Sequence, residues 1–211
     1  MVDIDINFNS STADKALDMA NSFLRKLVGP SLEEVGLTWS DNFKMRRIAN
    51  SIKNLAKVKK ILEGNNIDPK QVNLKVLIPY LENVSLEEDE TLQEVWANLF
   101  VNYLDASKNL NETVYPYILS QLSTQNIKII NAMANNNGKF TMIPEQKFAE
   151  EFVKNIEALP NLIRLGIIVL IPEPNSGLLT AGALSRKVDQ NYTTWYDLTS
   201  FGWNFFHACT R

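Results

Sequence analysis

Leu162-Ile-Arg-Leu-Gly-Ile-Ile-Val-Leu-Ile171 is the stretch that decides the fold, because it carries the chain from a helix into a β-strand. A helical pattern runs from Asn155 to Leu165, and Gly166 then supplies the turn. The run Ile167–Ile171 is apolar and rich in β-branched side chains, which favours a strand. This order predicts that the C-terminal half combines helices with a small sheet.

The segments on either side of this stretch complete the predicted domain. Downstream, a loop over residues 172–191 precedes a second strand at Tyr192–Leu198, and Thr199 caps a last helix at Ser200–Cys209. Upstream, the pattern predicts, in order, a short helix at 116–122, a helix capped by Ser123 and Thr124, a short strand at 140–143 and a helix at 144–152. This is the order of a winged helix-turn-helix module, so we predict a winged-helix-like domain at residues 113–211.

The N-terminal half is predicted to be helical. After a flexible lead-in at residues 1–11, apolar side chains recur every three or four residues from Thr12 to Val28. Further helices are expected at 30–62, at 68–81 with Pro79 kinking or dividing it, and after a capping box at 85–88. A polar connector follows at 105–113, so the helical domain spans 12–112. The predicted fold class is mainly α: an N-terminal helical bundle followed by a winged helix-turn-helix-like module with a small β-hairpin.

The bulk composition narrows the class of protein. The formal net charge of the 211 residues is −3, which is too small to indicate nucleic acid or acidic substrates by itself. A single cysteine rules out a disulfide framework within the chain and fits a reducing compartment. The N-terminus lacks the basic start and apolar run of a signal peptide, and no stretch approaches the roughly 18 apolar residues of a membrane span. We expect a cytoplasmic protein that does not bind membranes.

Several phrases in the middle of the sequence form a recognisable set: Leu81-Glu-Asn-Val-Ser85, Glu87-Glu-Asp89, Leu92-Gln93 and Trp96-Ala-Asn-Leu99. Supporting phrases are Gly29-Pro-Ser-Leu-Glu-Glu-Val-Gly36, Ile118-Leu-Ser-Gln-Leu-Ser123 and Tyr196-Asp-Leu-Thr-Ser-Phe-Gly202. Together they resemble the abortive infection alpha family of bacterial phage-defence proteins, and the resemblance spans residues 28–209. Val84 departs from the small residue expected there. The resemblance implies a role in abortive infection, but it brings neither a defined reaction nor a set of functional residues.

No group of residues forms a recognisable catalytic, cofactor or metal site. His207 and Cys209 are the only histidine and cysteine, whereas a zinc site needs about four such ligands. The acidic cluster at 87–90 fits the first turn of a helix, where carboxylates complement the helix dipole. The glycine-spaced segment 177–182 lacks the Lys-Ser/Thr that a phosphate loop requires. We therefore predict that the protein is not an enzyme and carries no cofactor.

A basic stripe on the second predicted helix is the most informative surface feature. Arg46, Lys53, Lys57 and Lys60 lie opposite the apolar face of that helix. Such a stripe is most often a solvated helix face, but it also suits phosphate contact or docking on an acidic partner. Glu82 and Glu94 widen the acidic field of residues 87–90, which could face the basic stripe of another helix or another subunit.

The winged-helix prediction raises the question of DNA binding. The presumed recognition helix offers Lys154, Asn155, Asn161 and Arg164, with Glu157 opposing them, and the wing adds Arg186 and Lys187. Residues 118–211 carry eight basic and seven acidic side chains, and the resulting net charge of +1 is small for a DNA-binding domain. We therefore expect the module to pack against the helical half or a partner rather than to read base sequence.

Three hypotheses for function remain at this point. The leading one is a phage-defence protein that acts through protein contacts, sensing or scaffolding, with an unknown phage or host protein as partner. Self-association is left open. The second is a DNA-binding transcriptional regulator that uses the winged helix and the basic stripe. An effector enzyme with an unfamiliar site comes third.

Overall fold

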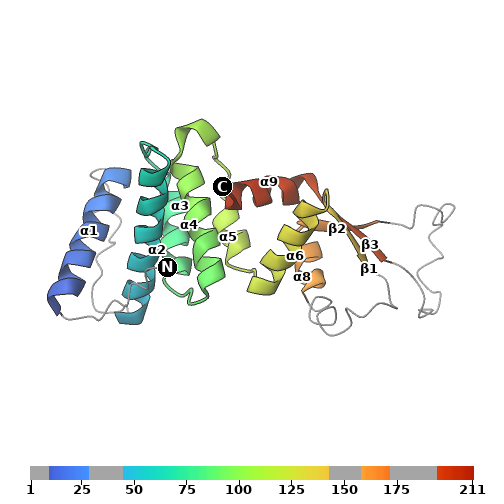
Figure 1. Cartoon of the computed structure of the whole chain (residues 1–211), viewed down its shortest axis with the longest axis horizontal. Helices are drawn as coiled ribbons and strands as arrows, with labels where there is room; N and C mark the ends of the chain where they lie inside the picture. Colours follow the sequence, from blue (N-terminus) through green and yellow to red (C-terminus); the bar gives the residue numbers. More distant parts are fainter. Residues whose placement is uncertain (1–9, 29–44, 143–157, 172–193) are drawn as a thin grey trace. The chain divides into compact units, whose positions relative to one another are not determined.

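The computed structural model describes residues 10–28, 45–142, 158–171 and 194–211 of the chain (Figure 1). The fold divides into two units, Met1–Tyr117 and Ile118–Arg211. The domain limits expected from the sequence, 12–112 and 113–211, stay a prediction. Residues 1–9 of the expected lead-in lie outside the described residues, whereas residues 10 and 11 are already helical, so the helix begins earlier than expected.

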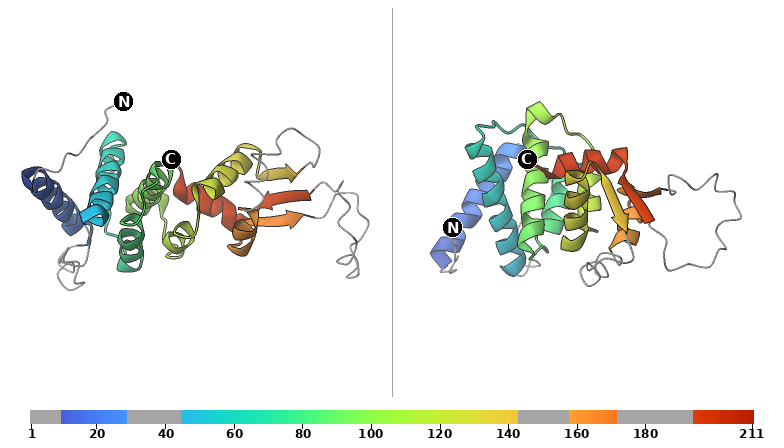
Figure 2. Two further views of the ribbon diagram at one scale, coloured as in Figure 1. Left: turned by 90° about the horizontal axis from the view of Figure 1, so that it is seen from below. Right: turned by 45° about the vertical axis from the view of Figure 1, so that its right-hand side comes forward.

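The first unit is built from helices that pack around α2 (Figures 1 and 2). Its elements are, in order, α1 (Ser10–Val28), α2 (Met45–Gly64), α3 (Leu74–Val84), α4 (Glu90–Leu104), the 3₁₀ turn η2 (Ala106–Lys108) and the start of α5 (Tyr115–Leu119). Helix α2 packs against α1, α3 and α4, and its most extensive contact is with α4. The predicted helical class of this half is confirmed, although part of the region expected to be helical at 30–62 lies outside the described residues.

Large aromatic side chains from α3 and α4 fill the centre of this unit. Tyr80, Trp96 and Phe100 are all buried. The Tyr80 ring stacks on Phe100 with centroids 3.9 Å apart and meets the edge of Trp96 at 6.1 Å. Aromatic pairs of this kind add about 0.5–1.5 kcal/mol beyond the area that they bury. The cluster therefore ties α3 firmly to α4.

Helix α3 begins later than the sequence suggested. Its N-cap is Asn73, whose side-chain oxygen accepts a hydrogen bond from the backbone N–H of Lys75 at 2.8 Å. Pro69, which lies within the helix expected at 68–81, instead forms an isolated β-bridge with Asp105. Pro79 does not divide the helix, because a proline removes only one intrahelical hydrogen bond and the surrounding side chains are buried.

The start of α4 also differs from the prediction. Ser85 ends α3 as its C-cap, and the carboxylate of Asp89 caps α4 by accepting from the N–H of Leu92 at 3.0 Å. Glu87 and Glu88 therefore precede the helix, and only Glu90 lies in its first turn. The expected capping box at 85–88 is wrong because Asp89 is an equally good N-cap and Ser85 is engaged elsewhere.

The second unit combines helices with a small antiparallel sheet. It contains the end of α5, α6 (Thr124–Asn135), β1 (Lys139–Met142), α8 (Leu159–Arg164), β2 (Ile168–Ile171), β3 (Thr194–Leu198) and α9 (Ser200–Cys209). The strand order is β1-β3-β2. The predicted hairpin is confirmed by the antiparallel pairing of β2 with β3, in which Ile168 lies opposite Leu198. The helix expected at 144–152 and the loop at 172–191 lie outside the described residues.

Helix α9 packs unusually close to the turn between α8 and β2. The Thr199 side chain caps α9 by accepting from the N–H of Gly202 at 2.9 Å, and its hydroxyl donates to the carbonyl of Gly166 at 2.6 Å. A Cβ atom added at Gly202 would collide with the backbone carbonyl of Ile167. Only glycine allows this approach, which explains the glycine at this position. Among the described helices, none is long and apolar enough to cross a membrane.

Candidate functional site

The side chains of one face of α2 contact the turn between α3 and α4 and the first turns of α4. They recur every three or four residues, so they share one face of the helix. We call them the α2 clamp: Arg47, Asn50, Lys53, Asn54 and Lys57. Two members of the predicted basic stripe, Lys53 and Lys57, belong to this clamp. The stripe is therefore engaged with the chain's own α4 at these two positions.

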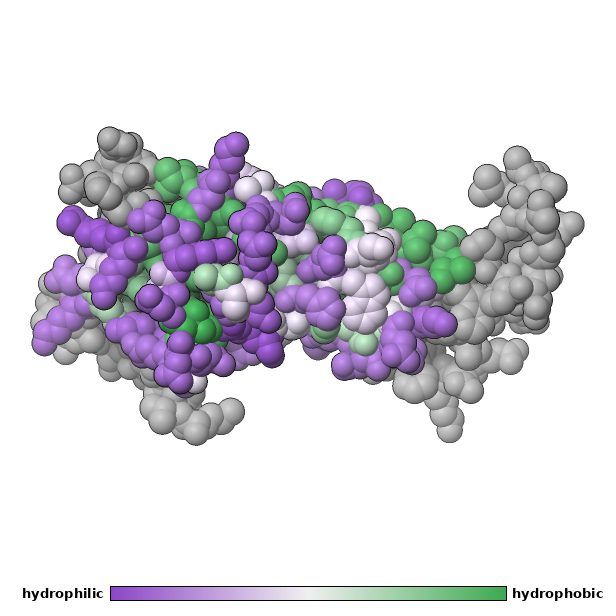
Figure 3. All heavy atoms as spheres, turned by 90° about the horizontal axis from the view of Figure 1, so that it is seen from above, coloured by the Kyte–Doolittle hydropathy of each residue, from purple (hydrophilic) through white to green (hydrophobic). Residues whose placement is uncertain are grey.

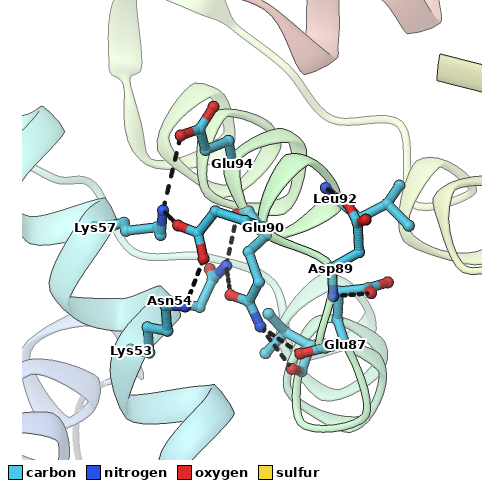
Figure 4. A network of polar contacts seen from close by, with 10 residues as sticks. Lys53, Asn54, Lys57, Glu87, Asp89, Glu90, Leu92 and Glu94 are labelled. Atoms are coloured by element: carbon cyan, nitrogen blue, oxygen red, sulfur yellow. Dashed lines mark hydrogen bonds and ion pairs between the residues drawn. The ribbon is translucent and has the colours of Figure 1, made fainter. Parts of the chain in front are cut away.

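The outer part of the clamp is made of ion pairs (Figure 4). The ammonium group of Lys53 lies 2.5 Å from Oε2 of Glu90, and Lys57 contacts the other carboxylate oxygen of the same residue. Lys57 also lies 3.9 Å from Glu94. The acidic field that the sequence placed opposite a basic helix thus meets α2 of the same chain. Two lysine charges are offset here by two glutamate charges, which weakens the positive field that a phosphate backbone would sense.

Glu90 is held as a carboxylate by this arrangement. Its hydrogen bonds from Lys53 and then Lys57 lower the pKa of the carboxyl group, and partial burial, which acts in the opposite direction, does not cancel them. The side chain of Glu90 is 54% exposed, so solvent screens the pairs and each contributes at most about 1 kcal/mol. The ion pairs fix geometry more than they add stability.

The inner part of the clamp is a buried hydrogen-bond network. The amide nitrogen of Asn54 donates to the side-chain oxygen of Gln93 at 2.5 Å and to its carbonyl at 2.7 Å. The Tyr80 hydroxyl donates to Oδ1 of Asn54 at 2.5 Å, and burial raises the pKa of Tyr80 well above its usual value. Tyr80 therefore stays a neutral donor. The network joins α2, α3 and α4 through groups that have no access to water.

The same network holds the backbone of the α3–α4 turn. The Gln93 amide donates to the carbonyl of Glu87 at 2.8 Å and to that of Val84 at 3.3 Å. From α2, Asn50 donates to the carbonyl of Ser85 at 3.2 Å, and Arg47 donates to its hydroxyl at 3.2 Å. The turn is thus held by side chains of α4 and of α2.

The basic stripe was predicted from the sequence, whereas the hydrogen-bond network was not. Lys60 is exposed on α2, and Arg46 lies in α2 with a side chain outside the described residues. The contacts of Asn54, Ser85 and Gln93 in this network were not predicted from the sequence. The signal available for Asn54 and Gln93 was a polar side chain directly beside the buried apolar positions of an amphipathic helix.

In the second unit, the predicted recognition helix turns its polar side chains toward its own module. Asn161 on α8 donates to the carbonyl of Gln121 at 2.7 Å and to Oδ1 of Asn126 at 3.3 Å. The guanidinium of Arg164 donates to the Gln121 side chain at 2.8 Å and to Asn161 at 2.7 Å, although Arg164 itself is exposed. The predicted wing residues Arg186 and Lys187, and Lys154 and Asn155 of the expected helix, lie outside the described residues.

His207 and Cys209 occupy different environments. Cys209 is buried, and burial raises the pKa of its thiol, which disfavours the reactive thiolate. His207 is exposed and its ring stacks on Trp203, with centroids 5.7 Å apart. In the part of the chain that the structure describes, no three or more His, Cys, Asp or Glu side chains gather in a way that could hold a metal ion.

Comparison with known proteins places these features in one family. The model of the abortive infection alpha family matches residues 44–209, a range that begins just before α2 and ends at the last residue of α9. It therefore includes the α2 clamp, the α3–α4 turn and the small sheet. No curated protein and no solved structure matches the chain significantly. Because the match spans most of its length, the chain belongs to the abortive infection alpha family.

Proposed function

We propose that this protein acts in abortive infection, as an anti-phage defence protein of the cytoplasm, and that it works through protein contacts rather than catalysis. The observation that carries the proposal is the family match over residues 44–209, since the family suggests a role in phage defence. The partner is a phage or host protein whose identity the fold does not define.

The polar groups of the described residues support contacts over catalysis. Lys53 and Lys57 each form an ion pair with Glu90, and Asn54 is hydrogen-bonded to Gln93 in the network that holds the α3–α4 turn. A catalytic base or nucleophile needs a pKa near the working pH and access to its substrate. The Cys209 thiol has neither, because it is buried and its pKa is raised.

We infer further that the second unit is a winged helix used for packing or partner binding. The sheet order β1-β3-β2, with α6 before it, α8 leading into β2 and α9 after β3, supports this assignment. The bonds from Asn161 and Arg164 to Gln121 support a structural use for α8, because groups that read bases must point outward.

Phage challenge tests the defence proposal. Cells expressing the chain should form fewer plaques than cells with an empty vector for at least one phage of a diverse panel. Cultures should also survive infection at low phage dose and collapse at high dose, because abortive infection sacrifices the infected cells. Plaque counts equal to the vector for every phage, with the protein shown to be expressed and folded, would overturn the proposal.

The alternative function, a DNA-binding regulator, is favoured by one observation: Arg164 at the end of α8 is exposed although its guanidinium donates to Gln121 and Asn161. Fluorescence anisotropy with duplex DNA at about 0.15 M salt decides it. A dissociation constant below about 1 µM that weakens in Arg164→Ala would favour the regulator. Binding no tighter than non-specific binding, with no effect of Arg164→Ala, would dismiss it.

A further inference from the structure

The α3–α4 turn carries an exposed leucine at its tip. Leu86 is 61% exposed, more than any other large hydrophobic residue in the part of the chain that the structure describes. A single exposed leucine is ordinary on a protein surface. Leu86 differs because its position is fixed: the carbonyls of its two neighbours, Ser85 and Glu87, accept hydrogen bonds from Asn50 and Gln93. A rigid apolar contact loses little entropy on binding.

Acidic side chains lie close to this leucine in the sequence. Glu82, Glu88 and Asp89 are exposed, and they outnumber the basic group of Arg47, which reaches the turn at Ser85. A surface that accepts Leu86 must therefore be apolar at its centre and positive at its rim, because like charges across an interface are unfavourable.

Helix α1 offers a surface of that chemistry. Its buried side consists of Ala20, Leu24 and Leu27, so the opposite side faces outward. The outward residues recur every three or four positions, and we call them the α1 stripe: Lys15, Met19, Ser22 and Lys26. Met19 is 36% exposed and lies between the two lysines. Asp18 and Arg25 are exposed beside the stripe and carry opposite charges, so the net charge of this face stays positive. The surface view shows mostly hydrophilic residues over the helical unit, with hydrophobic ones between them (Figure 3).

From this charge complementarity we propose that the α3–α4 turn of one copy docks on the α1 stripe of a second copy of this chain. Leu86 packs against Met19, while Glu82 and Glu88 meet Lys15 and Lys26. Each copy carries both surfaces, so the contact is made twice in a closed dimer or propagates in an open chain. The surfaces are small, so we expect the association to be weak and reversible. The proposal does not rest on phage defence, and its test uses no phage.

A pair of charge reversals gives a direct test by analytical ultracentrifugation of the full chain, over about 5–500 µM, where weak interfaces of this size populate. The first variant is Glu82→Lys/Glu88→Lys and the second is Lys15→Glu/Lys26→Glu. Circular dichroism establishes that each is folded. A matched control, Lys108→Glu/Glu112→Lys, reverses exposed charges elsewhere in the same unit.

The wild type should show a mean mass that rises with concentration and falls at high salt. Each variant alone should stay monomeric, because its two surfaces then carry the same charge. An equimolar mixture should associate again, since both contacts regain opposite charges, and the control should behave as the wild type. A wild type that is monomeric throughout would overturn the proposal. Variants that associate like the wild type, or a mixture that stays monomeric, would do the same.

Discussion

The side-chain amide of Asn54 on α2 donates a hydrogen bond of 2.5 Å to the side-chain oxygen of Gln93 on α4, at a point where both residues are almost wholly buried. Asn54 also accepts a hydrogen bond from the Tyr80 hydroxyl, and the side-chain amide of Gln93 also donates to carbonyls of the α3–α4 turn. A buried polar network that is fully satisfied specifies how elements meet, because any other arrangement leaves groups unpaired. It sets the geometry of the α3–α4 turn.

Removing one member of this network should destabilise the first unit. Asn54→Ala leaves the Tyr80 hydroxyl and the Gln93 side-chain oxygen without their partner. We expect a loss of about 2–3 kcal/mol in the free energy of unfolding, because unsatisfied buried groups keep their desolvation cost. Urea denaturation followed by circular dichroism measures it. Gln71→Ala, at an exposed position of the same unit, should change stability by less than about 0.5 kcal/mol. Equal effects of the two variants would contradict the network's role.

The ion pairs of Glu90 should give a pH-dependent contribution to stability. Because the folded state lowers the pKa of Glu90 below its ordinary value of 4.5, this contribution is present above pH 4.5 and is lost as the pH falls through the lower folded value. At pH 7 the wild type should exceed Glu90→Gln by up to about 1 kcal/mol, given the exposure of the pair. Denaturation midpoints measured from pH 7 to about pH 3 should converge at the acidic end. A difference that stays constant with pH would show that the pairing is unimportant.

Gly202 should not tolerate a side chain. Gly202→Ala forces α9 away from the carbonyl of Ile167, and overpacking against backbone costs about 1–3 kcal/mol or more. Gly64 at the end of α2 provides the control, since a Cβ there meets nothing within 4 Å. Thermal melts of Gly202→Ala and Gly64→Ala should therefore differ clearly. A Gly202→Ala protein as stable as the Gly64→Ala protein would mean that α9 packs less closely than described.

The single cysteine should be almost unreactive in the folded protein. Cys209 is buried and the pKa of its thiol is raised, so the thiolate that attacks a disulfide reagent is scarce and shielded. An Ellman assay should show very slow labelling in buffer and complete labelling of one thiol per chain in guanidinium chloride. Fast labelling of the native protein would contradict the burial of the C-terminal helix.

Local signals predicted the second unit better than the first. Ser123 and Thr199 cap α6 and α9 as expected, and the β-branched run forms β2 as expected. Each of these segments contains one such signal and no competing one. In the first unit two capping residues lie within five positions of each other, as Ser85 and Asp89 do before α4. Tertiary contacts from α2 then decide which one caps the helix, and no local pattern contains that information.

The candidate site shows the same limit. The basic stripe and the acidic field were both predicted from the sequence. A contact between them, across helices or across subunits, was left open. The pairing of Lys53 and Lys57 with Glu90 depends on how α2 lies against α4, across more than 30 residues of chain. The Asn54–Gln93 bond is of the same kind, because it joins residues 39 positions apart.

Plaque counting most directly tests the central claim, that this member of the abortive infection alpha family defends cells without an active site of its own. Cells carrying the wild-type chain should give fewer plaques than vector controls. His207→Ala and Cys209→Ser, which remove the only histidine and the only cysteine, should protect as well as the wild type where they fold. No protection by the wild type against any phage would contradict the claim, and so would loss of protection in a stably folded His207→Ala protein.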